Sequence, residues 1–219
     1  MKKITIITGH YGSGKTNFAV NLAISLAQKG EKITVADLDI VNPYFRSADF
    51  KELFRSFNIS LAVSAYAKSN LDIPALSFDA ESFIRDGEHL IVDVGGDDAG
   101  AIALGRYSEQ LTAAEEQLSV NMLYVINQYR YLTRKPEEAL ELMYEIEAAA
   151  RLRHTGIINN SHLCDETTAE TVLNSISFAD EVSEKSGLPI VYTTVPLGIS
   201  AIVKNPFPVH IYVKKIWEN

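Results

Sequence analysis

The residues best suited to chemistry lie near the N-terminus, where Gly9, Gly14, Lys15 and Thr16 match the spacing G-x-x-x-x-G-K-[ST]. A run of apolar and β-branched residues precedes this loop, and an amphipathic stretch follows it. Strand, glycine-rich turn and helix, in that order, are the context in which such a loop binds phosphate. Backbone N–H groups of the turn and the positive end of the helix dipole would surround the anion. The sequence therefore predicts a site for the phosphates of a nucleotide.

The residues of the loop have separate expected roles. Lys15 would reach the β- and γ-phosphates as a compact positive charge, and would therefore serve catalysis as well as binding. The hydroxyl of Thr16 is the expected ligand of Mg²⁺. The positions expected to contact the nucleotide here are Gly9, Tyr11, Gly12, Ser13, Gly14, Lys15, Thr16 and Asn17.

Carboxylates follow two other predicted strands. Asp93 comes directly after an apolar run, as expected of a residue that holds Mg²⁺ directly or through a water molecule. Asp37 and Asp39 lie at the end of the candidate strand over 32–37, and on an extended chain they share a face. One of the two would lie near the metal while the other positions the attacking water. Because the carboxyl ends of parallel strands meet at one edge of a sheet, we expect all three acids beside the phosphate loop.

The elements that must position these residues alternate along the chain. Apolar strand-like runs alternate with helical patterns, which is typical of βαβ units in an α/β fold. We expect one P-loop nucleotide-binding domain over 1–219, with a mainly parallel sheet of about seven strands and helices on both faces. Helices are predicted to begin at Pro136 and to run from about Glu166 to Glu184. Strands are predicted over 3–8, 32–37, 59–64, 89–94, 120–127, 155–159 and 189–195.

The composition limits the classes of partner and compartment. Lys and Arg number 20 against 28 Asp and Glu, and the net charge of -8 argues against broad nucleic-acid binding. A single cysteine, Cys164, cannot form an internal disulfide, which suits a reducing cytoplasm. The apolar run after Met1 is interrupted by Gly9, unlike a signal peptide, and no run reaches the length of a membrane span. We therefore expect a cytoplasmic protein that does not enter membranes.

Taken together, the segments Gly9–Thr16, Asp37–Asp39 and Asp93–Gly96 resemble the MinD/ParA group of P-loop ATPases. That group also includes the nitrogenase iron protein and the CobQ/CobB-type amidoligase domains. The resemblance implies ATP with Mg²⁺ as ligands, a nucleotide-dependent homodimer, and a partner protein that responds to the nucleotide state. By position, it implies that Asp37 lies near the metal and that Asp39 orients or activates water.

The same resemblance implies where the base would bind. In this group, residues at the end of a late strand and after the following strand contact adenine, and the comparable positions here are Asn159, Asn160, Pro196 and Leu197. An asparagine amide can pair with the adenine edge as donor and acceptor. The alternative is that each asparagine satisfies the backbone of its own turn. The sequence contains no Asn-Lys-x-Asp motif, the usual reader of guanine, and this favours ATP over GTP.

One position departs from the group. Many members carry a second lysine directly after the first glycine of the loop, and that lysine reaches the phosphates of the partner subunit. Here the position is His10, and a neutral imidazole stabilises developing negative charge far less than a lysine does. His10 keeps open a nucleotide-loaded binding module with negligible turnover, beside the leading reading, an ATPase that acts as a nucleotide switch. A third reading is an ATP-dependent small-molecule kinase or ligase resembling dethiobiotin synthetase, which uses the same fold.

Overall fold

The computed structural model describes residues 2–38, 50–62, 89–96, 98–114 and 118–212. Within this part of the chain, eight parallel strands form one sheet in the order β3-β2-β4-β1-β5-β6-β7-β8. The strands are β1 (Lys2–Thr8), β2 (Ile33–Leu38), β3 (Ser60–Ala62), β4 (His89–Val94), β5 (Leu118–Ile126), β6 (Gly156–Asn159), β7 (Ile190–Pro196) and β8 (Pro206–Val209). The prediction of an α/β fold with a parallel sheet is confirmed.

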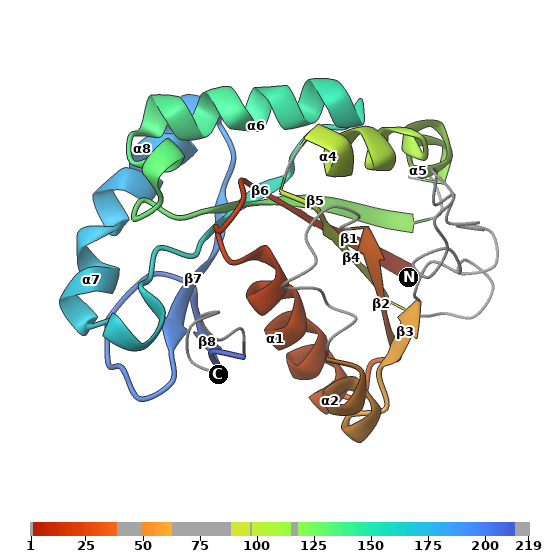
Figure 1. Cartoon of the computed structure of the whole chain (residues 1–219), viewed down its shortest axis with the longest axis horizontal. Coiled ribbons are helices and arrows are strands. Elements are labelled where there is room, and N and C mark those ends of the chain that lie inside the picture. The colour runs from red at the N-terminus through yellow and green to blue at the C-terminus, as the bar shows by residue number, and fades with distance from the viewer. Residues whose placement is uncertain (1, 39–49, 63–88, 97, 115–117, 213–219) are drawn as a thin grey trace.

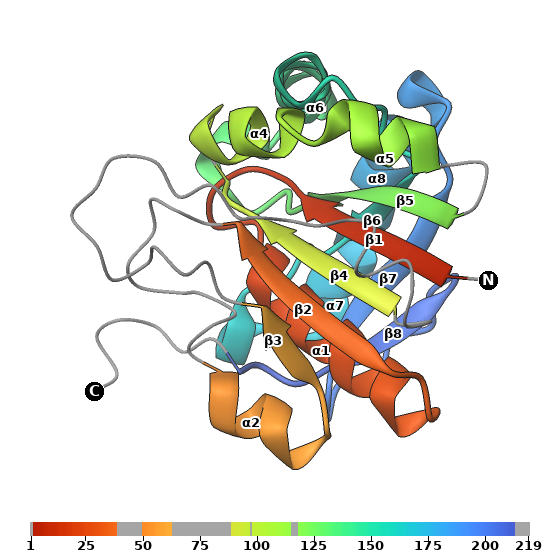
Figure 2. The same cartoon turned by 90° about the vertical axis from the view of Figure 1, so that its right-hand side faces the viewer.

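Helices cover both faces of this sheet, as Figures 1 and 2 show. One face carries α1 (Lys15–Gln28) and α2 (Lys51–Ser56), and the opposite face carries α4 (Asp98–Gly105), α5 (Ser108–Ala114), α6 (Pro136–Ala150) and α8 (Ile176–Ser186). Alternate residues of the central strands serve the two cores: Ile7 and Ile91 pack with α1, whereas Ile6 and Val92 pack beneath α4 and α5. The near-continuous apolar runs in the sequence follow from burial on both faces.

The strand β8 was not among the predicted strands, and its residues explain why. Pro206 and Pro208 lack a backbone N–H, so a stretch containing both is not expected in a sheet. The stretch lies at the edge of the sheet, next to β7, where a proline is tolerated. Its alternate residues Phe207 and Val209 are buried and complete the core beneath α1.

Of two predicted helices, one is confirmed and the other is divided in two. Helix α6 begins at Pro136 as predicted, and the side chain of Glu138 accepts a hydrogen bond from the N–H of Lys135 at 3.1 Å. The single helix predicted over 166–184 is instead two helices, α7 (Ala169–Asn174) and α8, which meet at Ser175. The hydroxyl of Ser175 donates to the carbonyl of Val172 at 2.7 Å, which supports the break.

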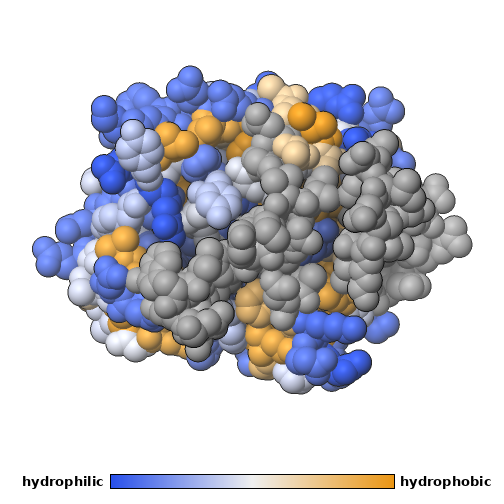
Figure 3. Space-filling view, viewed as in Figure 1, coloured by the Kyte–Doolittle hydropathy of each residue, from blue (hydrophilic) through white to orange (hydrophobic). Residues whose placement is uncertain are grey.

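The outward surface of α6 is mostly polar. Figure 3 shows a largely hydrophilic surface over α6 at the top of the molecule, in keeping with its exposed residues Glu141 and Glu145. Among the described residues, no helix is long and apolar enough to cross a membrane.

Candidate functional site

The predicted phosphate loop connects the end of β1 to the start of α1. β1 lies between β4 and β5 in the sheet, so the loop emerges at the centre of the carboxyl edge. The N–H of Ser13 donates to the carbonyl of His10 at 3.1 Å, and the N–H of Phe18 donates to that of Gly14 at 3.0 Å. These bonds close the turn and begin the helix, which is the strand-turn-helix context that the sequence predicts.

Two positions of the loop require glycine for two reasons: neighbouring atoms lie very close, and the backbone conformation disfavours other residues. Gly9 and Gly14 have φ angles of 146° and 91°, which disfavour other residues. A Cβ atom on Gly9 would lie 2.5 Å from the carbonyl oxygen of Val125, and one on Gly14 would overlap the side-chain amide of Asn160. The loop is therefore pressed against the ends of β5 and β6, and its shape depends on both neighbours.

Lys15 lies where the phosphate loop and the end of β4 meet. Its side chain is 7% exposed, and Nζ donates to the carbonyl oxygen of His10 at 3.2 Å. A Cβ atom on Gly96 would lie 2.5 Å from that Nζ and 2.7 Å from the backbone nitrogen of Tyr11. The structure thus brings Gly96, three residues after Asp93, directly against the loop.

Asp37 and Asp93 stand side by side on neighbouring strands. In the parallel register, Asp37 pairs with Asp93, and Asp93 pairs in turn with Ile7 of β1. Asp93 is buried and Asp37 is half-buried. Because side chains alternate along a strand, both acids share the sheet face of Ile7, the face that α1 covers. They are therefore on the same side of the sheet as the helix that starts with Lys15 and Thr16.

The donors near this edge suit a hard cation. Carboxylates and a hydroxyl are the oxygen ligands that Mg²⁺ accepts, usually together with water and phosphate oxygens. Among the residues that the structure describes, no group of three or more His, Cys, Asp or Glu could hold a metal alone. That Thr16, Asp37 and Asp93 together hold Mg²⁺, shared with a phosphate ligand, stays a prediction. Asp39, the predicted water-positioning residue, lies outside the described residues.

The two predicted base-contacting asparagines are buried and bound to protein groups. Asn160 donates to the carbonyl of Ser13 at 2.7 Å and accepts from the hydroxyl of Thr194 at 2.7 Å. Asn159 donates to the hydroxyl of Ser175 at 2.9 Å and accepts from the N–H of Ser161 at 3.3 Å. Both side chains hold the end of β6 against its neighbours, and Asn160 also supports the phosphate loop. Their contact with a base stays a prediction.

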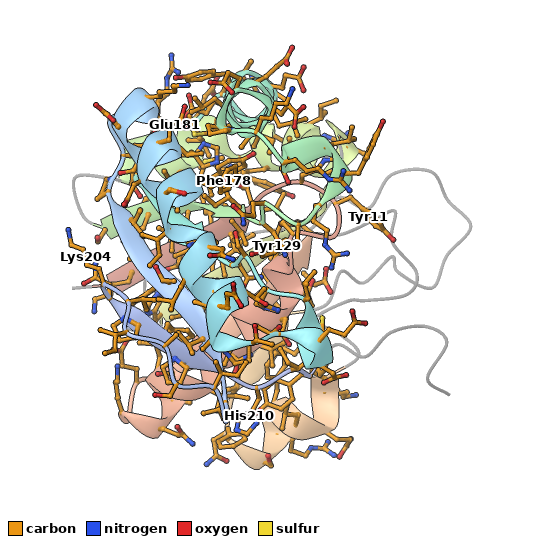
Figure 4. The ribbon with its side chains drawn as sticks, turned by 90° about the vertical axis from the view of Figure 1, so that its left-hand side faces the viewer. Tyr11, Tyr129, Phe178, Glu181, Lys204 and His210 are labelled. Atoms are coloured by element: carbon orange, nitrogen blue, oxygen red, sulfur yellow. The ribbon has the colours of Figure 1, made fainter. Side chains whose placement is uncertain are left out.

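The other predicted nucleotide contacts lie in different surroundings. Tyr11 is 56% exposed and lies at the right-hand edge of the side chains drawn in Figure 4. Leu197, at the end of β7, is exposed, whereas the preceding Pro196 is buried. Asn17 is buried, and its amide binds the chain that follows β8: it donates to the carbonyl of His210 at 3.0 Å and accepts from the N–H of Tyr212 at 2.8 Å.

The surroundings of His10 disfavour a positive charge on its side chain. Burial, reinforced by the nearby charge of Lys15, lowers the pKa of its imidazole. The backbone carbonyl of His10 has a clearer role, since it accepts the hydrogen bond from Lys15.

An arginine that no sequence motif predicts also lies at this site. Arg130 lies in the loop after β5, and its Nε would be 3.6 Å from a Cβ atom on Gly12. Its neighbours form no recognisable spacing pattern. The signal that would have found it is topological: β5 lies beside β1, so the residues that follow β5 must emerge next to the phosphate loop.

A buried polar chain ends directly before the loop. The hydroxyl of Thr8 lies 2.7 Å from Nε2 of His154, and Nδ1 of His154 lies 3.1 Å from Glu147. Burial raises the pKa of Glu147, but hydrogen bonds from His154 and Arg153 outweigh it and lower the pKa to about 2. An ionised Glu147 therefore fixes His154, which in turn positions the last residue of β1.

A cavity of about 560 Å³ lies away from this edge, on the sheet face that α6 covers. Its lining includes Ile6, Val120, Met122, Tyr144 and Leu152. None of the predicted site residues lines it, so the candidate site is defined by the loop and strand ends rather than by this cavity.

Comparison with known proteins gives three kinds of similarity. Residues 4–187 match the family described as CobQ/CobB/MinD/ParA nucleotide binding domain. The chain is 32% identical over 81 residues to the tyrosine-protein kinase YwqD of Bacillus subtilis (strain 168), a stretch covering 33% of this chain and 34% of that protein. The chain thus spans about a third of the length of this curated relative.

The solved structures share the fold at low sequence identity. FtsY from Mycoplasma mycoides superposes with a TM-score of 0.53 and 17% identity, covering 87% of this chain and 59% of that one. FtsY from Elizabethkingia anophelis, solved in complex with GDP, gives 0.54 and 16%, covering 89% and 58%. At this identity the likeness shows the fold alone. The family match extends over most of the chain and includes the phosphate loop, Asp37 and Asp93, and this chain therefore belongs to the CobQ/CobB/MinD/ParA nucleotide-binding domain family.

Proposed function

We propose that this chain binds ATP with Mg²⁺, hydrolyses it, and uses the difference between the two nucleotide states to act on a partner. The single observation that supports this most is the meeting of Lys15 and Gly96 at the carboxyl edge of the sheet, with Asp93 three residues away. A lysine and a carboxylate suited to Mg²⁺, both beside one phosphate loop, are parts that phosphoryl transfer uses.

In this proposal each charged group has a separate role. Lys15 binds the β- and γ-phosphates and offsets the charge that develops as the terminal phosphate leaves. Thr16, Asp37 and Asp93 hold Mg²⁺, which neutralises phosphate oxygens when it is bound. Asp39 remains the candidate that orients the attacking water.

The contacts of Gly95 and Gly96 suggest how the nucleotide state would reach the surface. Gly96 touches the phosphate loop, while a Cβ atom on Gly100 would lie 2.6 Å from the carbonyl oxygen of Gly95. Gly100 belongs to α4, so a movement of the glycine segment on loss of the γ-phosphate must also move α4. Ile102 of α4 is 53% exposed and would meet a partner there.

We propose two partners of different kinds. A second copy of the chain would bind in the ATP state near Tyr11, which is exposed beside the phosphate loop. A separate protein would bind at α4 and respond to its position. We also propose that the protein works in the cytoplasm, without broad nucleic-acid binding.

The test is calorimetric binding and single-turnover hydrolysis of ATP, each with and without Mg²⁺. Lys15→Ala should abolish binding or turnover, because Lys15 is the charge at the centre of the loop. Lys29→Ala, at the exposed end of the same helix, is the matched control and should behave as wild type. Equal ATP binding and turnover in the Lys15→Ala variant and wild type would reject the site. GTP in place of ATP tests the expected preference for adenine.

A second candidate is transfer of the γ-phosphate to an acceptor other than water. The 32% identity to a stretch of a tyrosine-protein kinase favours this chemistry, with a tyrosine hydroxyl as the acceptor. Labelled ATP distinguishes the two. Label that appears on a protein tyrosine or on an added metabolite supports transfer, whereas release only as inorganic phosphate supports the ATPase.

A further inference from the structure

The loop that joins β5 to α6 is held firmly at the edge of the candidate site. Asn127 anchors it: its amide donates to the carbonyl of His162 at 3.2 Å, and its side-chain oxygen accepts from the N–H of Tyr129 at 3.0 Å. The hydroxyl of Thr133 donates to the carbonyl of Asn127 at 2.8 Å. The hydroxyl of Tyr129, labelled in Figure 4, donates to the carbonyl of Thr171 at 2.7 Å. The backbone of Arg130 is therefore fixed, and only its side chain can adapt.

The side chain of Arg130 lies against the phosphate loop. Its Nε, Cδ and Cζ atoms lie 3.6, 3.7 and 3.8 Å from the position of a Cβ atom on Gly12, which has φ +75°. Arg130 is exposed, and its guanidinium forms no hydrogen bond or ion pair with the residues that the structure describes. Its neighbour Arg134 differs, since Arg134 lies over the ring of Tyr131 at 5.7 Å.

The phosphate loop beside this guanidinium already carries positive charge. The loop carries Lys15 and the N-terminal end of α1, whose first turn contains no acidic residue. Two like charges at one loop repel each other, and no described carboxylate forms an ion pair with Arg130. An anion bound at the loop removes this repulsion, and it gains two charged partners instead of one.

We propose that Arg130 binds the polyphosphate of the nucleotide within the same chain, next to Gly12, as a second cation beside Lys15. This inference rests on the proposed function and names a residue of that site. The planar guanidinium can donate two hydrogen bonds to phosphate oxygens, which a lysine cannot do in the same geometry. The ordered loop holds Arg130 ready, so little conformational entropy is lost on binding.

The experiment compares wild type with Arg130→Ala, Arg130→Lys and Arg134→Ala. Calorimetry with Mg²⁺ measures the Kd for AMP-PNP, a non-hydrolysable triphosphate, and for AMP. Arg130→Ala should weaken AMP-PNP binding roughly tenfold or more and AMP binding less than twofold, because a charged hydrogen bond to the outer phosphates is lost. Arg130→Lys should restore part of the affinity, and millimolar guanidinium should restore part of it to Arg130→Ala. Arg134→Ala, on the same loop, should match wild type.

Several results would overturn the inference. Equal AMP-PNP affinity in Arg130→Ala and Arg134→Ala would show that the guanidinium does not touch the phosphates. An equal loss for AMP and AMP-PNP would show that Arg130 only supports the loop. If wild type binds AMP-PNP while Arg130→Ala is unaffected, this inference fails and the proposed function stands; if wild type binds no nucleotide, both fail.

Discussion

Gly96 and Lys15 come from opposite sides of the candidate site and touch: a Cβ atom on Gly96 would lie 2.5 Å from Nζ of Lys15. The same atom would lie 2.7 and 2.8 Å from the backbone N and Cα of Tyr11. Lysine can swing aside, but the backbone of the phosphate loop cannot move without changing the loop.

This contact leads to the first prediction, for Gly96→Ala. The added methyl group should separate the glycine segment from the phosphate loop and weaken ATP binding about tenfold, a change of about 1.4 kcal/mol. The Kd for ATP with Mg²⁺ is the measurement. Gly30→Ala is the control, since Gly30 has φ +85° but no atom near its Cβ position. It should lose about 1 kcal/mol of stability and keep its affinity. Wild-type affinity in Gly96→Ala would mean that the segment can be displaced without effect on the site.

The second prediction concerns Asp93, which pairs in register with Asp37. Asp93→Asn keeps the shape of the side chain but removes the negative charge, so the gain in ATP affinity that Mg²⁺ gives should fall to a small fraction of the wild-type gain. The measurement is the ratio of Kd values with EDTA and with Mg²⁺. Asp180→Asn, on the exposed surface of α8, is the control. A wild-type ratio in Asp93→Asn would remove Asp93 from the metal site.

The third prediction is a pH dependence of stability that comes from His162. Burial, with a smaller contribution from the charge of Arg130, lowers the pKa of this imidazole to about 4. The unfolded chain binds a proton near pH 6.5 and the folded chain only near pH 4, so stability is lost as the pH falls through this window. The loss should reach about 3 kcal/mol by pH 4 from this group alone.

Urea unfolding of wild type and His162→Asn from pH 7 to pH 4 measures this effect. Asparagine retains an acceptor for the N–H of Cys164, which binds Nδ1 of His162 at 3.2 Å. The variant should show a shallower fall in the free energy of unfolding than wild type. Parallel curves for the two proteins would show that His162 titrates normally in the folded state.

The local pattern of apolar residues was sufficient to predict much of the fold. The predicted strands over 3–8, 89–94 and 120–127 correspond to β1, β4 and β5, because strands covered on both faces must be apolar along their whole length. The edge strand β8 was not predicted, because Pro206 and Pro208 have a low propensity for β-strands. Only its position at the edge, beside β7, allows the two prolines in the sheet.

Site residues that belong to a sequence motif could be predicted, whereas those that reach the site only through the order of the strands could not. Lys15 and Asp93 stand in recognisable sequence contexts, and the structure brings their segments together. Arg130 stands in none, and it reaches the phosphate loop only because β5 neighbours β1. Asn160 shows the reverse case, since a residue type suited to a base is here bound to Ser13 and Thr194.

Asn17 and Asn21 have a consequence for solution studies. Both project from the helix that Lys15 begins, and their side-chain oxygens accept hydrogen bonds from the backbone N–H groups of Tyr212 and His210 at 2.8 Å each. Deuterium uptake at these two amides therefore reports whether that helix keeps its native packing, and it needs no substitution or attached probe.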